Sequence, residues 1–377
     1  MEKFNGKKVI GKIVKATGLK ILDFYIIKKF LGTFFFSIVI ILSIAVVFDF
    51  SEKIDDFIEN GAPFREVIFD YYLNFIPYFA VLFSSLFTFI SVIFFTSKMA
   101  YNTEIIAILS SGVSFRRLLI PYMLSATLIA VFAFSLSNYV IPNANKIKLD
   151  FEEKYIHSRP VSFNRKNIHR QVRPGVFIYM ESYSNISLTG YNFSIEKYED
   201  GKLKSKLMAD QIHWDTTNNK WNIRRYYIRD INGLEETITT GNRIDTSLNM
   251  HPEDFSRRLN VVESMSLGEL NEFIKESKMQ GEVNITAFLI EKYRRTAFPF
   301  STFILTLIGV AVSSRKARGG IGVQLGAGLA ISFSYILFMQ FSSQFSIGGS
   351  LPPLVAVWIP NIIFAVVAIF LYKMAPK

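Results

Sequence analysis

The residues able to do chemistry do not form the groupings that enzymes use. Four histidines, His157, His169, His213 and His251, are scattered without metal-ligand spacing, and the chain has no cysteine. Neither a phosphate-binding G-x-x-x-x-G-K-[ST] loop nor a G-x-S-x-G nucleophile motif is present. We therefore expect a protein that is not an enzyme and that binds no metal and no cofactor directly.

One group of cations suits an anionic ligand instead. Lys292, Arg294 and Arg295 lie together just before an apolar run. An arginine side chain can bind a phosphate group through two parallel hydrogen bonds. Two other interpretations remain open, namely that these side chains extend to phospholipid headgroups or that they pair with Glu291.

The segments that must position these residues are mostly apolar. The chain of 377 residues is 50% hydrophobic, with 37 phenylalanines, and only 19% charged, against about 25% charged residues in soluble domains. A membrane span needs about 20 mostly apolar residues. Six such segments occur in two groups of three: Phe30–Phe48, Leu73–Phe95, Leu118–Val140, Phe298–Val312, Val323–Phe345 and Leu354–Tyr372. The sequence predicts a helical membrane protein with spans in regions 30–142 and 297–377.

The basic residues predict the orientation of these spans. Residues 1–29 form a basic arm with eight lysines, and basic loops then alternate with loops poor in Lys and Arg. Because cytoplasmic loops are enriched in Lys and Arg, we expect both termini in the cytoplasm and residues 143–290 outside it. The net charge of +11 then reflects orientation and attraction to anionic lipids rather than nucleic acid binding.

The region 143–265 changes to a strand-like pattern. Short runs rich in β-branched and aromatic residues are separated by turn signals such as Asp200-Gly201 and Asn232-Gly233. We expect an antiparallel β domain, either a sandwich or an open jelly roll, inserted between the third and fourth spans. Residues 266–296 then return as helix, beginning with a capping box at Ser266 and Glu269.

Part of this β domain is apolar on both faces. The run from Val176 to Met180 fits either a strand buried on both sides or a strand with one face lining an apolar groove for a lipid chain. The candidate groove residues are Phe177, Tyr179, Phe193, Ile195, Ile212 and Trp214.

The segment 97–115 between spans two and three carries a specific pattern. Its sequence Glu104-x-x-Ala107-x-x-x-x-Gly112-x-Ser114 closely resembles the coupling helix of the lipopolysaccharide-export permeases, the LptF/LptG family. Further similar segments occur in the same order along the chain: LDFYIIKKF (22–30), SLGEL (266–270), EKYRRTAFP (291–299) and LPPLVAVWIPNIIF (351–364). The segment LDFYIIKKF is more similar to the G-type members of the family.

The resemblance implies a permease subunit of an ATP-driven exporter in the inner membrane. Such a subunit pairs with a paralogous permease, a cytoplasmic ATPase dimer that binds ATP and Mg²⁺, and a periplasmic bridge with its membrane anchor protein. Lipopolysaccharide is extracted from the outer leaflet and passed through periplasmic jelly rolls to the bridge.

The resemblance also implies roles for individual residues. Glu104, Ala107, Gly112 and Ser114 would dock on the ATPase, although a solvated loop helix with Gly112 at its end predicts the same residues. Lys292, Arg294 and Arg295 would bind lipid phosphates. G-type members often carry a lysine near the outer end of span one, where this chain has Asp49, so phosphate binding there moves to Lys53 or to the partner subunit.

A function of another class also fits the sequence. The chain would then be a membrane-anchored periplasmic scaffold or a lipid-binding receptor without transport activity. This alternative predicts that the β domain suffices when it is attached to an unrelated anchor, and it leaves the Glu104 segment unexplained.

Overall fold

The computed structural model describes residues 19–156, 164–248, 250–252, 255, 259–282, 284–315 and 320–375. The chain folds into two compact units. Unit 1 contains residues up to Phe151 and from Leu289 onwards, and unit 2 contains Glu152–Phe288. Each unit is described by itself.

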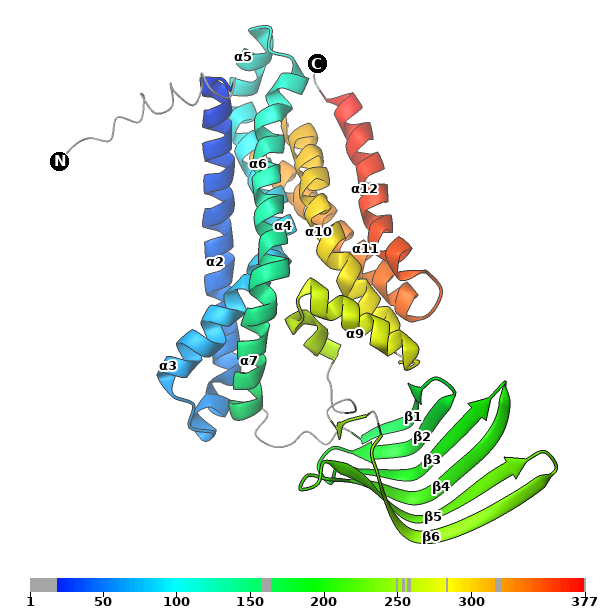
Figure 1. The fold of residues 1–377 in the computed structure, drawn as a ribbon. Helices are drawn as coiled ribbons and strands as arrows, with labels where there is room; N and C mark the ends of the chain where they lie inside the picture. The colour runs from blue at the N-terminus through cyan, green and yellow to red at the C-terminus, as the bar shows by residue number, and fades with distance from the viewer. Residues whose placement is uncertain are drawn as a thin grey trace. The chain divides into compact units, whose positions relative to one another are not determined.

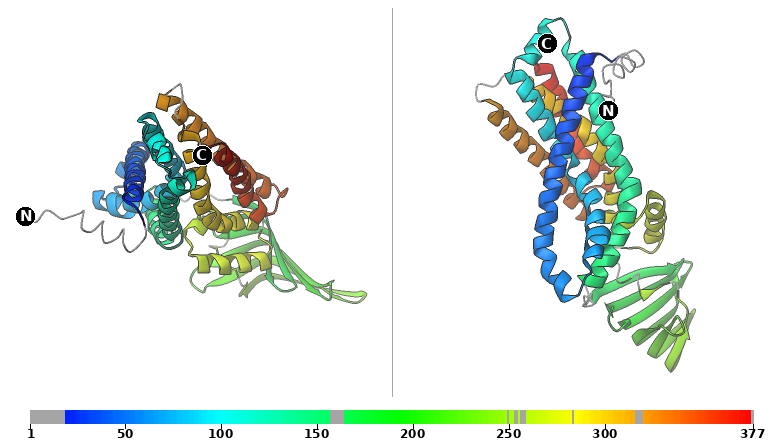
Figure 2. Two further views of the ribbon diagram at one scale, coloured as in Figure 1. Left: turned by 90° about the horizontal axis from the view of Figure 1, so that it is seen from above. Right: turned by 90° about the vertical axis from the view of Figure 1, so that its left-hand side faces the viewer.

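Unit 1 is built from long apolar helices (Figures 1 and 2). Within the described part of the chain, six helical segments are long and apolar enough to cross a membrane, which confirms the predicted spans in two groups of three. The first three are α2 (Ile21–Glu59), α3–η1–α4 (Phe64–Glu66, Val67–Tyr72, Leu73–Tyr101) and α6–η2–α7 (Phe115–Ser135, Leu136–Val140, Ile141–Tyr155). The last three are α10 (Ile285–Ser313), α11 (Gly320–Ile347) and α12 (Pro353–Met374), and the short helix α5 (Glu104–Ser110) joins α4 to α6.

Two glycines bring helices of the second group close to α4. A Cβ atom at Gly309 of α10 would lie 2.8 Å from Cγ1 of Val92, and one at Gly328 of α11 would overlap the side chain of Ile93. Small residues let helix backbones approach in a membrane, where packing rather than the hydrophobic effect drives association. The two groups of spans therefore meet at α4.

Polar side chains add hydrogen bonds between the spans. Ser85 and Ser301 join α4 to α10 with their hydroxyl oxygens 2.6 Å apart. Asn361 of α12 donates to the carbonyl oxygen of Ala297 at 3.0 Å and accepts from the Tyr335 hydroxyl at 2.9 Å. This asparagine thus connects three helices in a region where an unsatisfied amide would be costly.

Unit 2 contains a single antiparallel sheet of six described strands in the order β1-β2-β3-β4-β5-β6. The strands are β1 (Asn164–Arg173), β2 (Val176–Ser184), β3 (Thr189–Glu199), β4 (Lys202–Asp215), β5 (Lys220–Asn232) and β6 (Glu235–Thr246). The predicted β domain between spans three and four is confirmed, as an open meander rather than a two-sheet sandwich. The first described strand begins at Asn164, and α7 ends at Tyr155.

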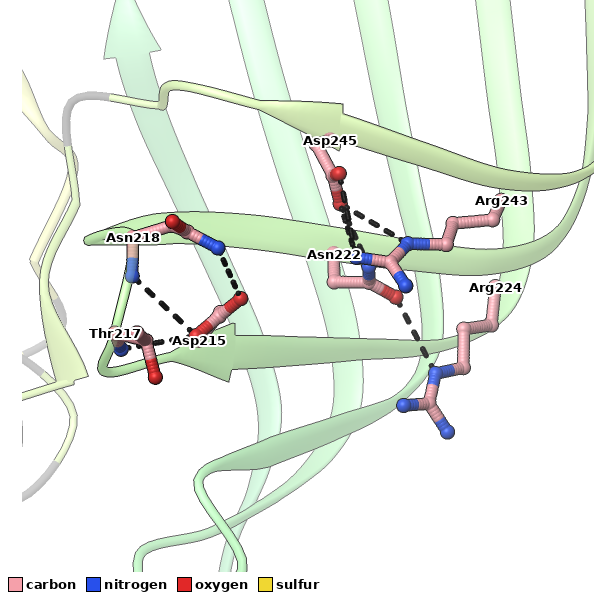
Figure 3. A network of polar contacts seen from close by, with 7 residues as sticks. All are labelled: Asp215, Thr217, Asn218, Asn222, Arg224, Arg243 and Asp245. Atoms are coloured by element: carbon pink, nitrogen blue, oxygen red, sulfur yellow. Dashed lines mark hydrogen bonds and ion pairs between the residues drawn. The ribbon is translucent and has the colours of Figure 1, made fainter.

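The strand connections follow the turn signals of the sequence. Gly201 and Gly233 have φ angles of 73° and 69°, in the left-handed region that glycine tolerates best. Between β4 and β5, Asp215 accepts hydrogen bonds from the backbone N–H of Thr217 at 2.9 Å and from the Asn218 amide at 2.9 Å (Figure 3). These bonds, the Asn218 side chain first, lower the pKa of Asp215.

A second polar group in Figure 3 connects β5 to β6. Asn222 donates to Asp245 at 2.6 Å and accepts from Nε of Arg224 at 3.3 Å, while Arg243 lies 3.3 Å from Asp245. These cross-strand contacts hold together the start of β5 and the end of β6.

The return from the sheet begins as predicted. A short 3-10 helix, η3 (Leu259–Ser264), precedes α9 (Leu267–Met279). The Ser266 hydroxyl accepts from the backbone N–H of Glu269 at 3.3 Å, and the Glu269 carboxylate accepts from the backbone N–H of Ser266 at 2.7 Å. This reciprocal pair is the predicted capping box.

Candidate functional site

The helix α5 lies at the end of unit 1 that also carries the start of α2 and the end of α12 (Figure 1). The Glu104 carboxylate accepts from the Tyr25 hydroxyl of α2 at 3.2 Å and from the Asn102 amide at 3.3 Å. Ile105 is buried and anchors the helix, whereas Tyr101 and Ile106 are 56% and 52% exposed. This end of unit 1 thus exposes two large side chains and carries a carboxylate within a few positions of them in the sequence.

The other residues of the 97–115 pattern have local roles that the structure makes visible. Ala107 is exposed on α5, which leaves a flat helix surface. Gly112 has a φ angle of 87°, which disfavours any residue with a side chain, so it permits the turn from α5 into α6. Ser114 is the N-cap of α6, accepting from the backbone N–H of Arg117 at 3.4 Å.

A buried ion pair behind α5 was not predicted from the sequence. Asp23, at the start of α2, is 2% exposed and receives both terminal nitrogens of Arg117, one of them at 2.7 Å from Oδ1. The carboxylate also accepts from the backbone N–H of Lys20 at 2.6 Å. The pair fixes the start of α2 to the start of α6.

Lys53 lies in a polar cluster near the end of α2 away from α5. Its ammonium group is 2.9 Å from Asp49 and also donates to the Tyr71 hydroxyl. Tyr71 and Tyr72 donate to the two carboxylate oxygens of Asp49, each at 3.2 Å. Two consecutive tyrosines can reach one carboxylate because they lie in η1, a π-helical segment that changes the angle between successive side chains.

The three cations near the start of α10 differ in their surroundings. Glu291 pairs with both arginines, at 2.5 Å from Arg294 and 3.1 Å from Nε of Arg295. The Arg295 side chain is 4% exposed but that of Arg294 is 39% exposed, and the Lys292 ammonium lies 5.9 Å from the Tyr293 ring centroid. The pairing with Glu291 that the sequence left open is present, and Arg294 is the arginine that remains accessible.

The candidate groove residues fall on two faces of the sheet. Phe193, Ile195, Ile212 and Trp214 belong to one continuous apolar cluster, whereas Phe177 and Tyr179 point to the opposite face. We call the first surface the apolar face; its buried strand residues are Val172, Ile178, Met180, Tyr183, Phe193, Ile195, Leu207, Ala209, Ile212, Trp214, Trp221 and Ile223. Phe177 and Tyr179 are among the residues that line a hollow of about 470 Å³, where the Lys206 side chain, 2.8 Å from Glu196, lowers the pKa of that carboxyl.

A row of residues that crosses the sheet contains three with positive φ angles, in the left-handed backbone region; we call it the left-handed row. Asn167 in β1, Asn192 in β3 and Arg225 in β5 have φ angles of 53°, 50° and 50°. The strand register aligns them with Glu181 in β2 and Asp210 in β4. Across this left-handed row, Asn192 donates to Glu181, and Arg225 lies 3.0 Å from Asp210.

The left-handed row explains why the strands alternate only in part. Ile223 and Tyr226, on the two sides of Arg225 in β5, both pack in the apolar cluster although they are three positions apart. A regular strand would place such residues on opposite faces. The row therefore keeps the apolar face continuous over both halves of the curved sheet (Figure 1).

The described residues contain no group of three or more His, Asp or Glu side chains arranged to hold a metal ion. Residues 24–374 match the family described as Lipopolysaccharide export system permease LptF/LptG. The comparison with curated proteins finds no match.

Proposed function

Since this chain belongs to the LptF/LptG family of lipopolysaccharide export permeases, we propose that it is a permease subunit of an ATP-driven exporter in the inner membrane. It extracts lipopolysaccharide from the outer leaflet and passes the lipid to a periplasmic bridge. A separate cytoplasmic ATPase dimer binds ATP and Mg²⁺ and hydrolyses the nucleotide, and a paralogous permease completes the membrane part. Both termini lie in the cytoplasm and the β domain in the periplasm.

The surface formed by α5 supports coupling to the ATPase. Tyr101 and Ile106 are large exposed side chains within three positions of Glu104 in the sequence, at the helical connection between two spans. Exposed apolar anchors beside one charged group are typical of a protein docking site. Glu104 would pair with a basic residue of the ATPase, and α5 would transmit its movement to α4 and α6.

The apolar face of the sheet is the observation that carries the proposal. Its twelve buried strand residues are apolar apart from the Tyr183 hydroxyl and the indole N–H groups of Trp214 and Trp221, and they extend over β1 to β5. Such a surface suits acyl chains, because burial of each CH₂ group contributes about 0.8 kcal/mol. Arg294, with Lys292 and Lys53, would bind the phosphates of the lipid headgroup through charge-assisted hydrogen bonds.

Photocrosslinking in membranes of active cells tests this function. A photoreactive residue at Ile195, on the apolar face, should capture lipopolysaccharide, and the same residue at Tyr191, which is exposed on the opposite face, should not. Purification should also recover a paralogous permease and an ATPase. The absence of lipopolysaccharide from position 195 during active export would refute the proposed path.

The two arginines of α10 should respond differently to substitution. We expect Arg294→Ala to reduce lipopolysaccharide capture about tenfold, because one charge-assisted contact contributes about 1.5–3 kcal/mol, while the unfolding temperature stays unchanged. Arg295→Ala should lower the stability by about 1–3 kcal/mol, because it removes the buried one of the two guanidinium groups that pair with Glu291. Lipid capture and thermal unfolding of both variants check the difference, and equal behaviour of the two would contradict it.

A further inference from the structure

Tyr183 carries an unmet hydrogen-bonding group within the apolar face. Its side chain is 0% exposed, and none of the described residues lies within hydrogen-bonding distance of its hydroxyl. Native proteins satisfy the large majority of buried polar side-chain atoms, and an unsatisfied one destabilises the fold. A phenylalanine ring would pack equally well at this position without a buried hydroxyl. The hydroxyl of Tyr183 therefore needs an explanation other than packing.

The indole N–H of the neighbouring Trp221, unlike the Tyr183 hydroxyl, has a hydrogen-bond partner within the described part of the chain. Trp221 is also fully buried on the apolar face, 6.5 Å from Tyr183 between ring centroids, but its indole N–H donates to the carbonyl oxygen of Met250 at 2.9 Å. The described residues thus provide a partner for the indole and none for the adjacent hydroxyl. Tyr183 is the position on this face where a ligand oxygen would complete the hydrogen bonding.

The cover over Tyr183 is a side chain from outside the strands. Phe255, which follows β6, packs on the apolar face together with Met250. Its ring centroid lies 4.9 Å from that of Tyr183. An acyl chain that takes the place of the Phe255 ring would contact the Tyr183 ring, which carries the hydroxyl. Burial raises the pKa of Tyr183, so the hydroxyl stays protonated and able to donate at neutral pH.

We propose that Tyr183 donates a hydrogen bond to an oxygen atom on an acyl chain, an ester carbonyl or a chain hydroxyl, as the lipid passes along the apolar face. This inference rests on the proposed function, because it takes the apolar face as the path of the lipid. A plain alkyl chain leaves the hydroxyl unsatisfied, whereas an oxygen-bearing chain does not. Tyr183 is therefore a specificity-determining residue for acyl chains that carry oxygen.

The test uses the full-length protein in the assembled exporter, with the photoreactive residue at Ile195. Tyr183→Phe should reduce lipopolysaccharide capture about three- to tenfold, the effect of losing one hydrogen bond. Its unfolding temperature should be unchanged or higher, because the substitution removes an unsatisfied buried hydroxyl. The matched control is Tyr191→Phe on the opposite face, which should leave both quantities unchanged.

The outcomes separate this inference from the proposed function. Equal capture with and without Tyr183→Phe would overturn the role of the hydroxyl, and so would a loss of capture accompanied by a lower unfolding temperature. If position 195 captures no lipopolysaccharide even with Tyr183 present, the proposed function fails. The mass of the product distinguishes a glycolipid from a phospholipid, and capture of phospholipid alone would also overturn the proposed function.

Discussion

Glu104→Ala should reduce ATP-driven lipopolysaccharide export at least about tenfold, because a charged residue at the centre of a docking surface commonly contributes 2 kcal/mol or more to binding. Tyr101 and Ile106, close to Glu104 in sequence, are exposed, and the carboxylate accepts hydrogen bonds from Tyr25 and Asn102 among the described residues. The measurements are lipid release from proteoliposomes and the amount of ATPase that copurifies with the permease. Normal values of both in Glu104→Ala would remove Glu104 from the coupling surface.

Two further variants show whether the charge or the local hydrogen bond matters. Tyr25→Phe removes the donor to Glu104 and keeps the carboxylate, so we expect export close to that of the unmodified protein. Glu104→Gln keeps an acceptor for Tyr25 and loses the charge, so it should behave like Glu104→Ala. Ser110→Ala, an exposed position on the same helix, serves as the control for altering α5 itself.

Arg117→Ala should destabilise unit 1 by about 3 kcal/mol, because it leaves the buried Asp23 carboxylate without its ion pair. Thermal unfolding of the detergent-solubilised protein measures the change. Arg116→Ala is the matched control, since the neighbouring Arg116 is exposed and makes a hydrogen bond to the Tyr372 hydroxyl at 3.3 Å. We expect that control to change the stability by less than about 0.5 kcal/mol.

The double variant Asp23→Ala/Arg117→Ala tests the cause of this loss. Because it removes both charges, it should be more stable than Arg117→Ala alone. A double variant at least as unstable as Arg117→Ala would show that the arginine acts through packing rather than through the buried carboxylate.

The features predicted correctly from the sequence depend on local chemistry. Six spans follow from the length and apolarity of each segment, and the capping box at Ser266 and the turns at Gly201 and Gly233 depend on residues within a few positions of each other. The inserted β domain follows in the same way from short strand patterns between turn signals.

The features that were missed depend on residues far apart in the chain or on unusual backbone. Asp23 and Arg117 are 94 positions apart, so nothing in the sequence couples them. Phe177 and Tyr179 are grouped with Phe193 and Ile195 as groove candidates without a face being assigned, but they pair across the strands with Glu196 and Ser194, so the register, which the sequence does not reveal, places them on the other face. Asn167 and Asn192 are residue types that tolerate positive φ angles, but Arg225 is not, so the row as a whole gave no readable pattern.

The left-handed row also protects the sheet against misfolding by register slip. If any strand shifted by one residue against its neighbours, its apolar side chains would turn to the wrong face, as in every sheet. Here the shift would also move a positive-φ residue such as Asn192 out of line with Arg225 and Asn167 and separate the polar partners Arg225 and Asp210. A slipped sheet therefore loses the alignment of its positive-φ residues and its cross-strand polar contacts together with its apolar face. The native strand register is thus favoured over slipped registers during folding.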